Sequence, residues 1–199
     1  MDSKRITENA AEYVRELFRG NSGGHDAEHT LRVYRNAMLL ADTEPGCDRT
    51  VVALAALLHD ADDHKLFRTE NNRNARQFLK ENSVPDETAD RICRIINGVS
   101  FSQNRGRVPD TVEGRIVQDA DRLDSIGAVG IARAFAYGGE HGRPMSESVQ
   151  HFHDKLLLIK DLMNTPAARE IALKRHSWLE AFLEELDAET GGTADDPGR

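Results

Sequence analysis

Two histidines and two aspartates occupy positions in the sequence where their chemistry stands out. His59 and Asp60 follow directly after VVALAALL at 51–58, the most hydrophobic run of the chain. Burying a charged group there costs several kcal/mol unless it is paired or bound to a metal ion. His29 lies in GGHDAEHTLRV, and Asp121 lies in VQDADRLDSIG. Two imidazoles and two carboxylates without a thiolate suit divalent ions such as Mn, Fe, Co, Zn or Mg.

Each of these four residues also has an ordinary structural explanation. A histidine at the end of a helix can interact with the last carbonyl groups, and an aspartate beside a helix commonly caps it. A histidine early in a helix, as expected for His29, is often a surface group. Because the spacing in the sequence does not show that the four side chains converge, both interpretations stay open at this point.

The elements that carry these residues are predicted to be helices. Hydrophobic residues recur with helical periodicity along nearly the whole chain, and we find no alternating run typical of a strand. The pattern predicts helices over these segments: 6–18, 31–41, 51–58, 74–80, the residues after Pro85, 111–123 and 127–137. The helix over 51–58 is apolar all round, which predicts that it lies in the centre of the protein and holds His59 rigidly at its end.

Two further helical segments are expected toward the C-terminus. A Gly-Gly pair at 138–139 is predicted to stop the preceding helix and to open a polar loop. One long apolar stripe runs over 149–163. Thr165 and Pro166 are expected as the N-cap and the first position of the last helix. That helix is expected to bury three large side chains: Trp178, Phe182 and Leu186.

Composition limits the classes of protein to which this chain can belong. Its 199 residues, 39% of them hydrophobic, suffice for one domain, expected over 1–187, with a disordered tail over 188–199. The formal net charge of -8 argues against general nucleic-acid binding.

No apolar run approaches the roughly 20 residues of a membrane span, and the N-terminus lacks a signal-peptide core, so we expect a cytoplasmic protein without a membrane partner. Cys47 and Cys93 form no C-x-x-C unit and are expected to be buried or half-buried apolar residues.

The order His, then His-Asp, then Asp resembles the HD-domain family of metal-dependent phosphohydrolases. Three longer phrases carry the resemblance: HDAEHTLRV, ALLHDADDHK and QDADRLDSIGAVGIARA. HFHDKLLLIKDLMNT and the last helix are also similar to the small stand-alone bacterial members, so the resemblance covers residues 5–187. It implies a single-domain, all-α helical bundle of the HD type with a central metal site. The ligands of the ion would be His29, His59, Asp60 and Asp121.

The resemblance also implies a class of reaction. Similar members are associated with hydrolysis of nucleoside triphosphates to the monophosphate and pyrophosphate. Binuclear members carry further histidines between the HD pair and the last aspartate; because this interval contains only His64, we expect one divalent ion. Four protein ligands leave two positions open on an octahedral ion but fill tetrahedral zinc, so Mn, Mg, Co or Fe suits catalysis better than Zn. A nucleotide is the expected small-molecule partner, and apolar helix faces are compatible with a homodimer.

Hydrolysis of a phosphoanhydride requires positive groups for the phosphates and a group that transfers a proton. Lys65, five residues after Asp60, and Arg122, next to Asp121, are candidates to bind substrate together with Lys155 on a later helix. His64 and Asp63 are the candidate catalytic acid or base, since an imidazole transfers protons near neutral pH. The alternative for each of these residues is a solvated charge.

Other functions use the same residues. A phosphomonoesterase that removes phosphate from nucleoside monophosphates would need the same ligands. A non-catalytic nucleotide or metal sensor with this fold is a third interpretation, which the presence of all four ligand positions disfavours. In the loop after the HD pair, Asp62 or Asp63 could act only by fixing the tautomer of a ligating histidine.

Overall fold

The computed structural model describes residues 2–21, 26–64, 66–104 and 106–191, with the backbone alone at 102 and 103. This part of the chain is helical and contains no strand, which confirms the all-α prediction. The first helices are α1 (Ser3–Leu17), α2 (Ala27–Ala41), α3 (Arg49–Leu58), α4 (Arg73–Glu81), α5 (Asp86–Asn97) and α6 (Phe101–Asn104). The later ones are α7 (Val112–Asp124), α8 (Gly127–Glu140), α9 (Met145–Asp154), the 3-10 helix η1 (Leu156–Leu162) and α10 (Pro166–Thr190).

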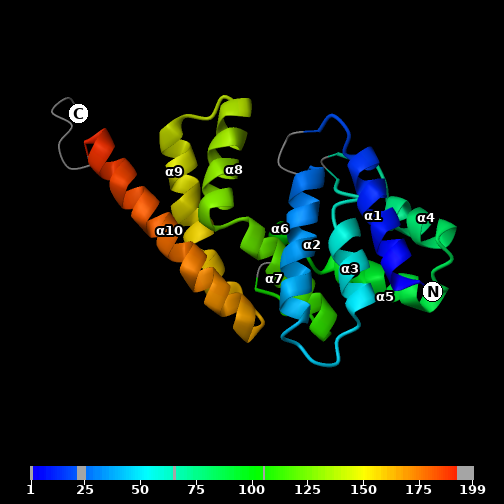
Figure 1. The fold of residues 1–199 in the computed structure, drawn as a ribbon. Coiled ribbons are helices and arrows are strands. Elements are labelled where there is room, and N and C mark those ends of the chain that lie inside the picture. The colour runs from blue at the N-terminus through cyan, green and yellow to red at the C-terminus, as the bar shows by residue number, and fades with distance from the viewer. Residues whose placement is uncertain (1, 22–25, 65, 105, 192–199) are drawn as a thin grey trace.

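Helix α3 forms the centre of the protein, as predicted. Every residue from Val51 to Leu58 is buried, and α1, α2, α5 and α7 pack around it (Figure 1). The carboxylate of Asp48 caps the helix by accepting hydrogen bonds from the backbone N–H groups of Thr50 and Val51, at 3.0 and 3.1 Å. Because α3 is enclosed on all sides, the residues at its C-terminal end are held rigidly.

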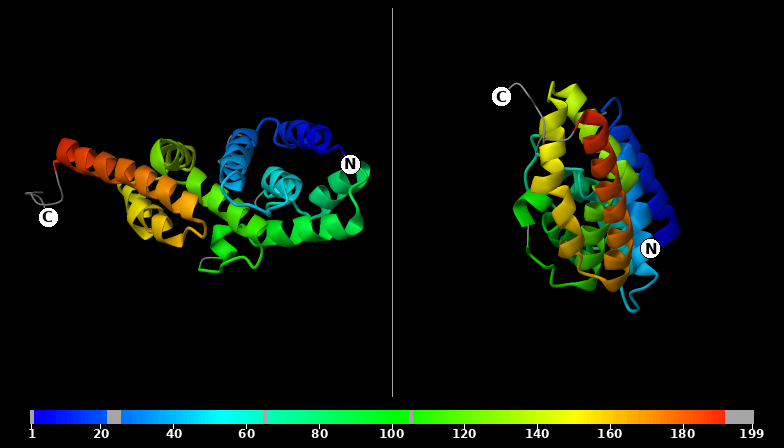
Figure 2. Two further views of the ribbon diagram at one scale, coloured as in Figure 1. Left: turned by 60° about the horizontal axis from the view of Figure 1, so that its bottom comes forward. Right: turned by 90° about the vertical axis from the view of Figure 1, so that its left-hand side faces the viewer.

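A second group of helices, α8, α9, η1 and α10, covers the other side of α7. Figures 1 and 2 show α10 on the side of the molecule away from α1. Phe152 of α9 and Phe182 of α10 stack with ring centroids 6.0 Å apart. The start of α10 is tied to α7 by Asp119, whose buried carboxylate accepts hydrogen bonds from the backbone N–H groups of Asn164 and Thr165, both at 2.8 Å. Helix α7 therefore contacts both groups and can carry functional side chains between them.

The structure corrects two predicted helix boundaries. The stripe over 149–163 is not one continuous helix, because α9 ends at Asp154 and the chain continues as the tighter helix η1. Lys155, with φ -138° and ψ -59°, makes the break. The Gly-Gly pair does not stop α8, which continues to Glu140. Instead, Gly138 allows α8 and α9 to approach closely, since a Cβ atom there would lie 2.5 Å from Oγ of Ser148.

Helix α10 also differs from the expectation. Trp178 is 61% exposed, because the buried face of α10 is formed by Ala168, Ala172, His176 and Leu179, and Trp178 lies beside this face. Phe182 and Leu186 are half-buried. The helix continues to Thr190, three residues into the predicted tail, and ends at its C-cap Gly191; residues 192–199 are outside the described residues.

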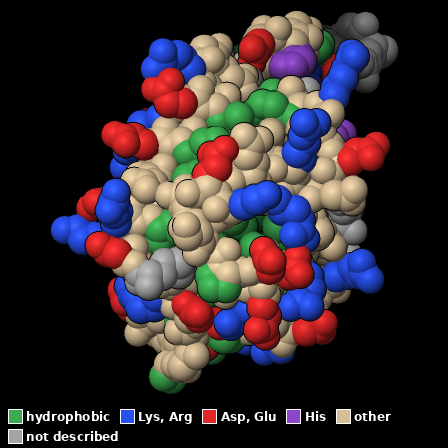
Figure 3. All heavy atoms as spheres, turned by 90° about the vertical axis from the view of Figure 1, so that its right-hand side faces the viewer, with side chains coloured by type: hydrophobic (Ala, Val, Ile, Leu, Met, Phe, Trp, Pro, Cys, Tyr) green, Lys and Arg blue, Asp and Glu red, His purple; other side chains and the backbone are tan. Residues whose placement is uncertain are grey.

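On the face shown in Figure 3, acidic and basic side chains are interspersed rather than gathered into one field. No helix in the described part of the chain has the length and apolar character needed to cross a membrane. Cys47 is half-buried and Cys93 is buried, as predicted, and both are free thiols.

Candidate metal centre

Three helices bring the four predicted ligand residues together. His29 lies in the first turn of α2. The backbone N–H of His29 donates a hydrogen bond to the carboxylate of Asp26, the N-cap of this helix, at 2.7 Å. His59 and Asp60 follow the C-terminal end of α3, and Asp121 lies on α7. Because α2 packs against both α3 and α7, their side chains meet at one point.

The side-chain atoms at this point are spaced as the ligands of one ion would be. The Nε2 atoms of His29 and His59 are 3.3 Å apart. Oδ2 of Asp60 is 3.5 and 3.4 Å from these two nitrogens, and Oδ1 of Asp121 is 3.5 and 3.9 Å from them. Atoms bound to one ion at about 2.1 Å lie about 3 to 3.5 Å from one another. His29, His59 and Asp121 thus form a cluster that could hold a metal ion, with a carboxylate oxygen of Asp60 beside both imidazoles.

Both imidazoles are oriented for ligation through Nε2. Nδ1 of His59 donates to the carbonyl oxygen of Ala56 at 2.8 Å. Nδ1 of His29 donates to Oδ2 of Asp124 at 2.7 Å. Each bond places the ring proton on Nδ1 and leaves the Nε2 lone pair directed at the cluster. The side chains of both histidines are 3% exposed, so these bonds are shielded from water.

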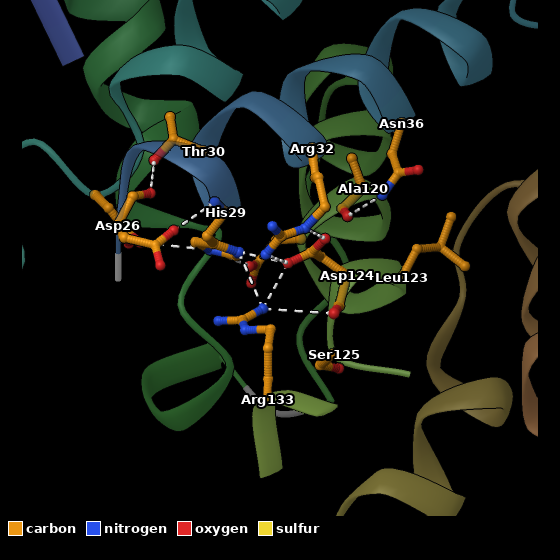
Figure 4. Close-up of polar contacts among 12 residues, drawn as sticks. Asp26, His29, Thr30, Arg32, Asn36, Ala120, Leu123, Asp124, Ser125 and Arg133 are labelled. Carbon is orange, nitrogen blue, oxygen red and sulfur yellow. Dashed lines mark hydrogen bonds and ion pairs between the residues drawn. The ribbon is translucent and has the colours of Figure 1, made fainter. Parts of the chain in front are cut away.

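Asp124 connects the metal centre to two arginines (Figure 4). Besides His29, its carboxylate accepts hydrogen bonds from Nε and Nη2 of Arg32, at 2.8 and 3.1 Å, and from Nη1 of Arg133 at 2.5 Å. The Asp124 side chain is 2% exposed. Burial alone would raise the pKa of Asp124, but the hydrogen bonds from His29 and Arg32 hold it well below its usual range. Asp124 is therefore an anion that fixes the position of His29.

The electrostatics of the cluster favour a cation. Burial alone would lower the pKa of His59, but the carboxylates of Asp60 and Asp121 raise it to about 9. For His29, burial again acts to lower the pKa, and hydrogen bonds to Asp124 and Asp60 outweigh it. The carboxylates thus favour positive charge at this point. A divalent ion would supply that charge and displace the proton from His59.

A cavity of about 210 Å³ opens beside the cluster. Four residues chosen from the sequence as catalytic or substrate-binding candidates line it: Asp63, His64, Arg122 and Lys155. His64 is exposed and Lys155 is half-buried. Nζ of Lys155 lies 4.6 Å from the centroid of the Phe101 ring, which also lines the cavity. The fifth candidate, Lys65, lies outside the described residues.

Two residues considered in the sequence analysis, Arg122 and Asp62, have structural partners that limit their roles. Arg122 is 3% exposed, and its guanidinium donates hydrogen bonds to the backbone carbonyls of Leu162 and Asn104. Arg122 thus ties α7 to η1 and α6 at the edge of the cavity. Asp62 fixes no histidine tautomer, since its carboxylate accepts from the backbone N–H groups of Asn74 and Ala75 and so caps α4.

Sequence reasoning missed Asp124, Arg32 and Arg133. A signal for Asp124 was present, because it follows Asp121 by three residues and so lies on the same face of α7. Arg32 had a comparable signal, since it follows His29 by three residues on α2, whereas Arg133 had none. Their contacts with Asp124 join α2 and α8 to α7 and exist only in the folded chain.

The family model of the HD domain matches residues 26–126, a range that contains all four predicted ligands. This chain belongs to the HD-domain family. Bacillus subtilis YpgQ is 39% identical over 201 residues, which cover 96% of this chain and 97% of YpgQ.

Solved structures of this family share the whole fold. The crystal structure of Bacillus subtilis YpgQ in complex with ADP matches with a TM-score of 0.83 and 35% identity, covering 95% of this chain and 97% of that one. An HD-superfamily hydrolase from Bacillus thuringiensis matches with a TM-score of 0.78 and 36% identity, covering 95% and 98%. The HD-family chain described here therefore has the fold of a metal-dependent phosphohydrolase, with a cluster that could hold its ion.

Proposed function

We propose that this HD-domain protein hydrolyses nucleoside triphosphates to the monophosphate and pyrophosphate in the cytoplasm, using one divalent ion bound by His29, His59, Asp60 and Asp121. The observation that carries the proposal is the convergence of two Nε2 atoms and two carboxylates beside a cavity that Lys155 also lines. YpgQ, which is similar over nearly its whole length, was crystallised with ADP. A nucleotide is therefore the ligand class we assign to this cavity.

The donor set fits a divalent ion that accepts nitrogen and oxygen. When bound, such an ion would supply a Lewis acid that lowers the pKa of water and neutralises charge on phosphate oxygens. Two imidazoles and two carboxylates would leave positions open on an octahedral ion, which suits Mn, Mg, Co or Fe. The proposal therefore predicts activity with these ions and weaker activity with Zn.

Side chains around the cavity would position the triphosphate. Lys155 and Arg133 bring positive charge to the cavity wall and would bind phosphate oxygens. The cavity volume of about 210 Å³ is below the usual range of about 300 to 1,000 Å³ for whole-ligand pockets. We therefore assign the enclosed space to the phosphates and the opening to the nucleoside.

A proton must reach the leaving group or leave the attacking water. Asp63 and His64 both line the cavity within four residues of Asp60. His64 is exposed, so it can exchange protons with solvent. We propose His64 as the group that transfers the proton and Asp63 as an alternative base.

The test is hydrolysis of a nucleotide panel with Mn, Mg, Co and Zn, read by separate assays for phosphate and pyrophosphate. Hydrolysis in ¹⁸O-labelled water identifies the bond that is broken. Attack at the α-phosphorus puts the label in the monophosphate, whereas attack at the β-phosphorus puts it in pyrophosphate. Monophosphates as the best substrates, with phosphate as product, would assign a phosphomonoesterase instead.

Matched histidine variants link the activity to the cluster. His59→Ala should lose bound metal and hydrolysis while it keeps its helical circular dichroism. His153→Ala removes an exposed histidine of α9 that does not line the cavity and should behave as wild type. Full metal occupancy in the His59 variant would refute the ligand assignment. Metal binding without hydrolysis of any nucleotide would favour a sensor.

A further inference from the structure

A second cavity lies behind the metal centre. It has a volume of about 370 Å³ and is lined by residues of α2, α8 and α10, including Arg32, Arg35, Arg175 and Trp178. It shares no lining residue with the cavity beside the ligand cluster. His29 lines the first cavity and Asp124 lines the second, so the hydrogen bond between them separates the two spaces.

The lining of this second cavity is positive in a protein that is negative overall. It contains three arginines and one carboxylate, Asp124, whereas the whole chain has a formal charge of -8. The charge of Asp124 is already matched by Arg32, Arg133 and His29. Arg35 is exposed and has no ion pair among the described residues. The cavity thus has uncompensated positive charge, which favours an anionic ligand.

Two of the guanidinium groups are held in place before any ligand binds. Arg32 is fixed by its two hydrogen bonds to Asp124. Arg175 donates from Nη1 to the carbonyl oxygen of Leu123 and from Nη2 to Oδ1 of Asn36, at 2.5 and 3.1 Å. Burial lowers the pKa of Arg175, so a nearby anion would stabilise its charged form. Arginines fixed in this way bind phosphate with little loss of side-chain entropy.

Trp178 adds a flat apolar surface to the same cavity. Trp178 is 61% exposed, although tryptophan is the largest of the apolar residue types. Val129, which also lines the cavity, is 38% exposed. A purine or pyrimidine base stacks on an aromatic ring with a free energy of about 1 to 3 kcal/mol. The combination of a stacking surface with several guanidinium groups suits a ligand that has both a base and phosphates.

We propose that this second cavity binds a nucleoside phosphate, with the base stacked on Trp178 and the phosphates bound by Arg35, Arg175 and Arg32. The site is separate from the proposed catalytic cavity and does not depend on the reaction assigned to it.

The chain offers a direct probe for this site, because Trp178 is its only tryptophan. Metal-free protein is titrated with ADP while Trp178 emission is recorded, and adenosine and inorganic pyrophosphate are titrated as fragments. ADP should quench the emission to saturation and bind more tightly than either fragment. The same titration of Asp121→Asn should give the same curve, because Asp121 lines only the catalytic cavity.

A pair of charge reversals tests the location. Arg35→Glu should weaken ADP binding at least about tenfold, the effect of losing one charge-assisted contact. Arg15→Glu, at a position on α1 that is also exposed, should leave ADP binding unchanged. Calorimetry on Trp178→Ala should show a loss of about tenfold, within the range of one base stack. Both Arg35 and Arg15 are exposed, so neither variant should affect folding.

Several results would overturn this inference. Emission that does not respond to ADP, or responds equally in the Arg35 and Arg15 variants, would refute it. A response that disappears in Asp121→Asn would place the ligand in the catalytic cavity. If Trp178 emission changes with protein concentration instead, and sedimentation shows self-association, the surface is an interface between copies and the inference is wrong. Because binding is measured without metal, none of these results bears on hydrolysis.

Discussion

Replacing Asp124 by Asn removes one negative charge from the network behind the metal centre while keeping the shape of the side chain. The carboxylate accepts from His29 at 2.7 Å and from Arg32 at 2.8 and 3.1 Å. An amide has one accepting oxygen, and its NH₂ group would face donors. Nδ1 of His29 would therefore lose its fixed partner, and both imidazole tautomers would become accessible.

The size of the effect follows from two separate losses. Removing a hydrogen-bond partner of a ligating histidine costs about 10- to 100-fold in metal affinity, or about 1.4 to 2.7 kcal/mol. Arg32 and Arg133, each 27% exposed, would also lose their shared carboxylate. Leaving such charges without a partner costs about 2 to 4 kcal/mol of folding stability, which corresponds to a fall in Tm of about 5 to 15 °C.

A matched substitution on the same helix separates these two losses. Asp119 is a fully buried carboxylate of α7 that binds Asn164 and Thr165 and does not contact the ligand cluster. Asp119→Asn should lower Tm but leave the Mn affinity of the folded protein within about threefold of wild type. Mn titration by calorimetry, with circular dichroism melting in parallel, gives both quantities. The reasoning is refuted if Asp124→Asn binds Mn like wild type, or if both variants lose affinity equally.

Four further predictions concern other residues around the ligand cluster and its cavity. His64→Ala should lower kcat by about 10² to 10⁴ without loss of bound metal, and a change below about threefold would remove His64 from the mechanism. Lys155→Ala should raise KM for triphosphate about tenfold, as steady-state kinetics would show. Arg122→Ala should lower Tm by about 5 to 10 °C, because two backbone carbonyls lose their donor; an unchanged Tm would show that these bonds add nothing. Metal affinity should rise about tenfold per pH unit up to about pH 9, because His59 has a pKa of about 9 without the ion and must lose its proton before Nε2 can bind. An affinity that stays constant between about pH 6 and 9 would refute this.

The helices were predictable because they depend on local pattern, whereas the spacing of the four ligand residues left their convergence open and only the resemblance to the HD-domain family implied it. Periodic burial fixes which residues face inward, and the apolar run at 51–58 could only be a central helix. The same reasoning failed for Trp178, since a large apolar side chain beside the buried face of a helix stays exposed when nothing packs on that side. The break at Lys155 was also invisible, because Phe152, Leu156 and Ile159 are buried equally well on either side of it.

Partners that come from distant parts of the chain could not be predicted from the sequence. Arg122 was chosen because it neighbours Asp121, but adjacent residues of a helix point about 100° apart. Its guanidinium accordingly binds the carbonyls of Leu162 and Asn104. Arg133 was not chosen, although it lies near His29 in space, because 104 residues separate the two in the chain.

Helix α7 shows how one short segment supplies three carboxylates with different roles. In QDADRLD the aspartates are at 119, 121 and 124. Each residue of a helix is rotated by about 100° from the one before it, so Asp121 and Asp124 lie about 60° apart around the helix axis. Asp119 lies about 160° from Asp121. Asp121 and Asp124 therefore both face α2, where one meets Nε2 of His29 and the other meets Nδ1. Asp119 points to the opposite side and holds the start of α10. Substituting the three aspartates one at a time should thus have three different effects. The change at Asp121 should affect metal binding alone, the change at Asp124 both metal binding and stability, and the change at Asp119 stability alone.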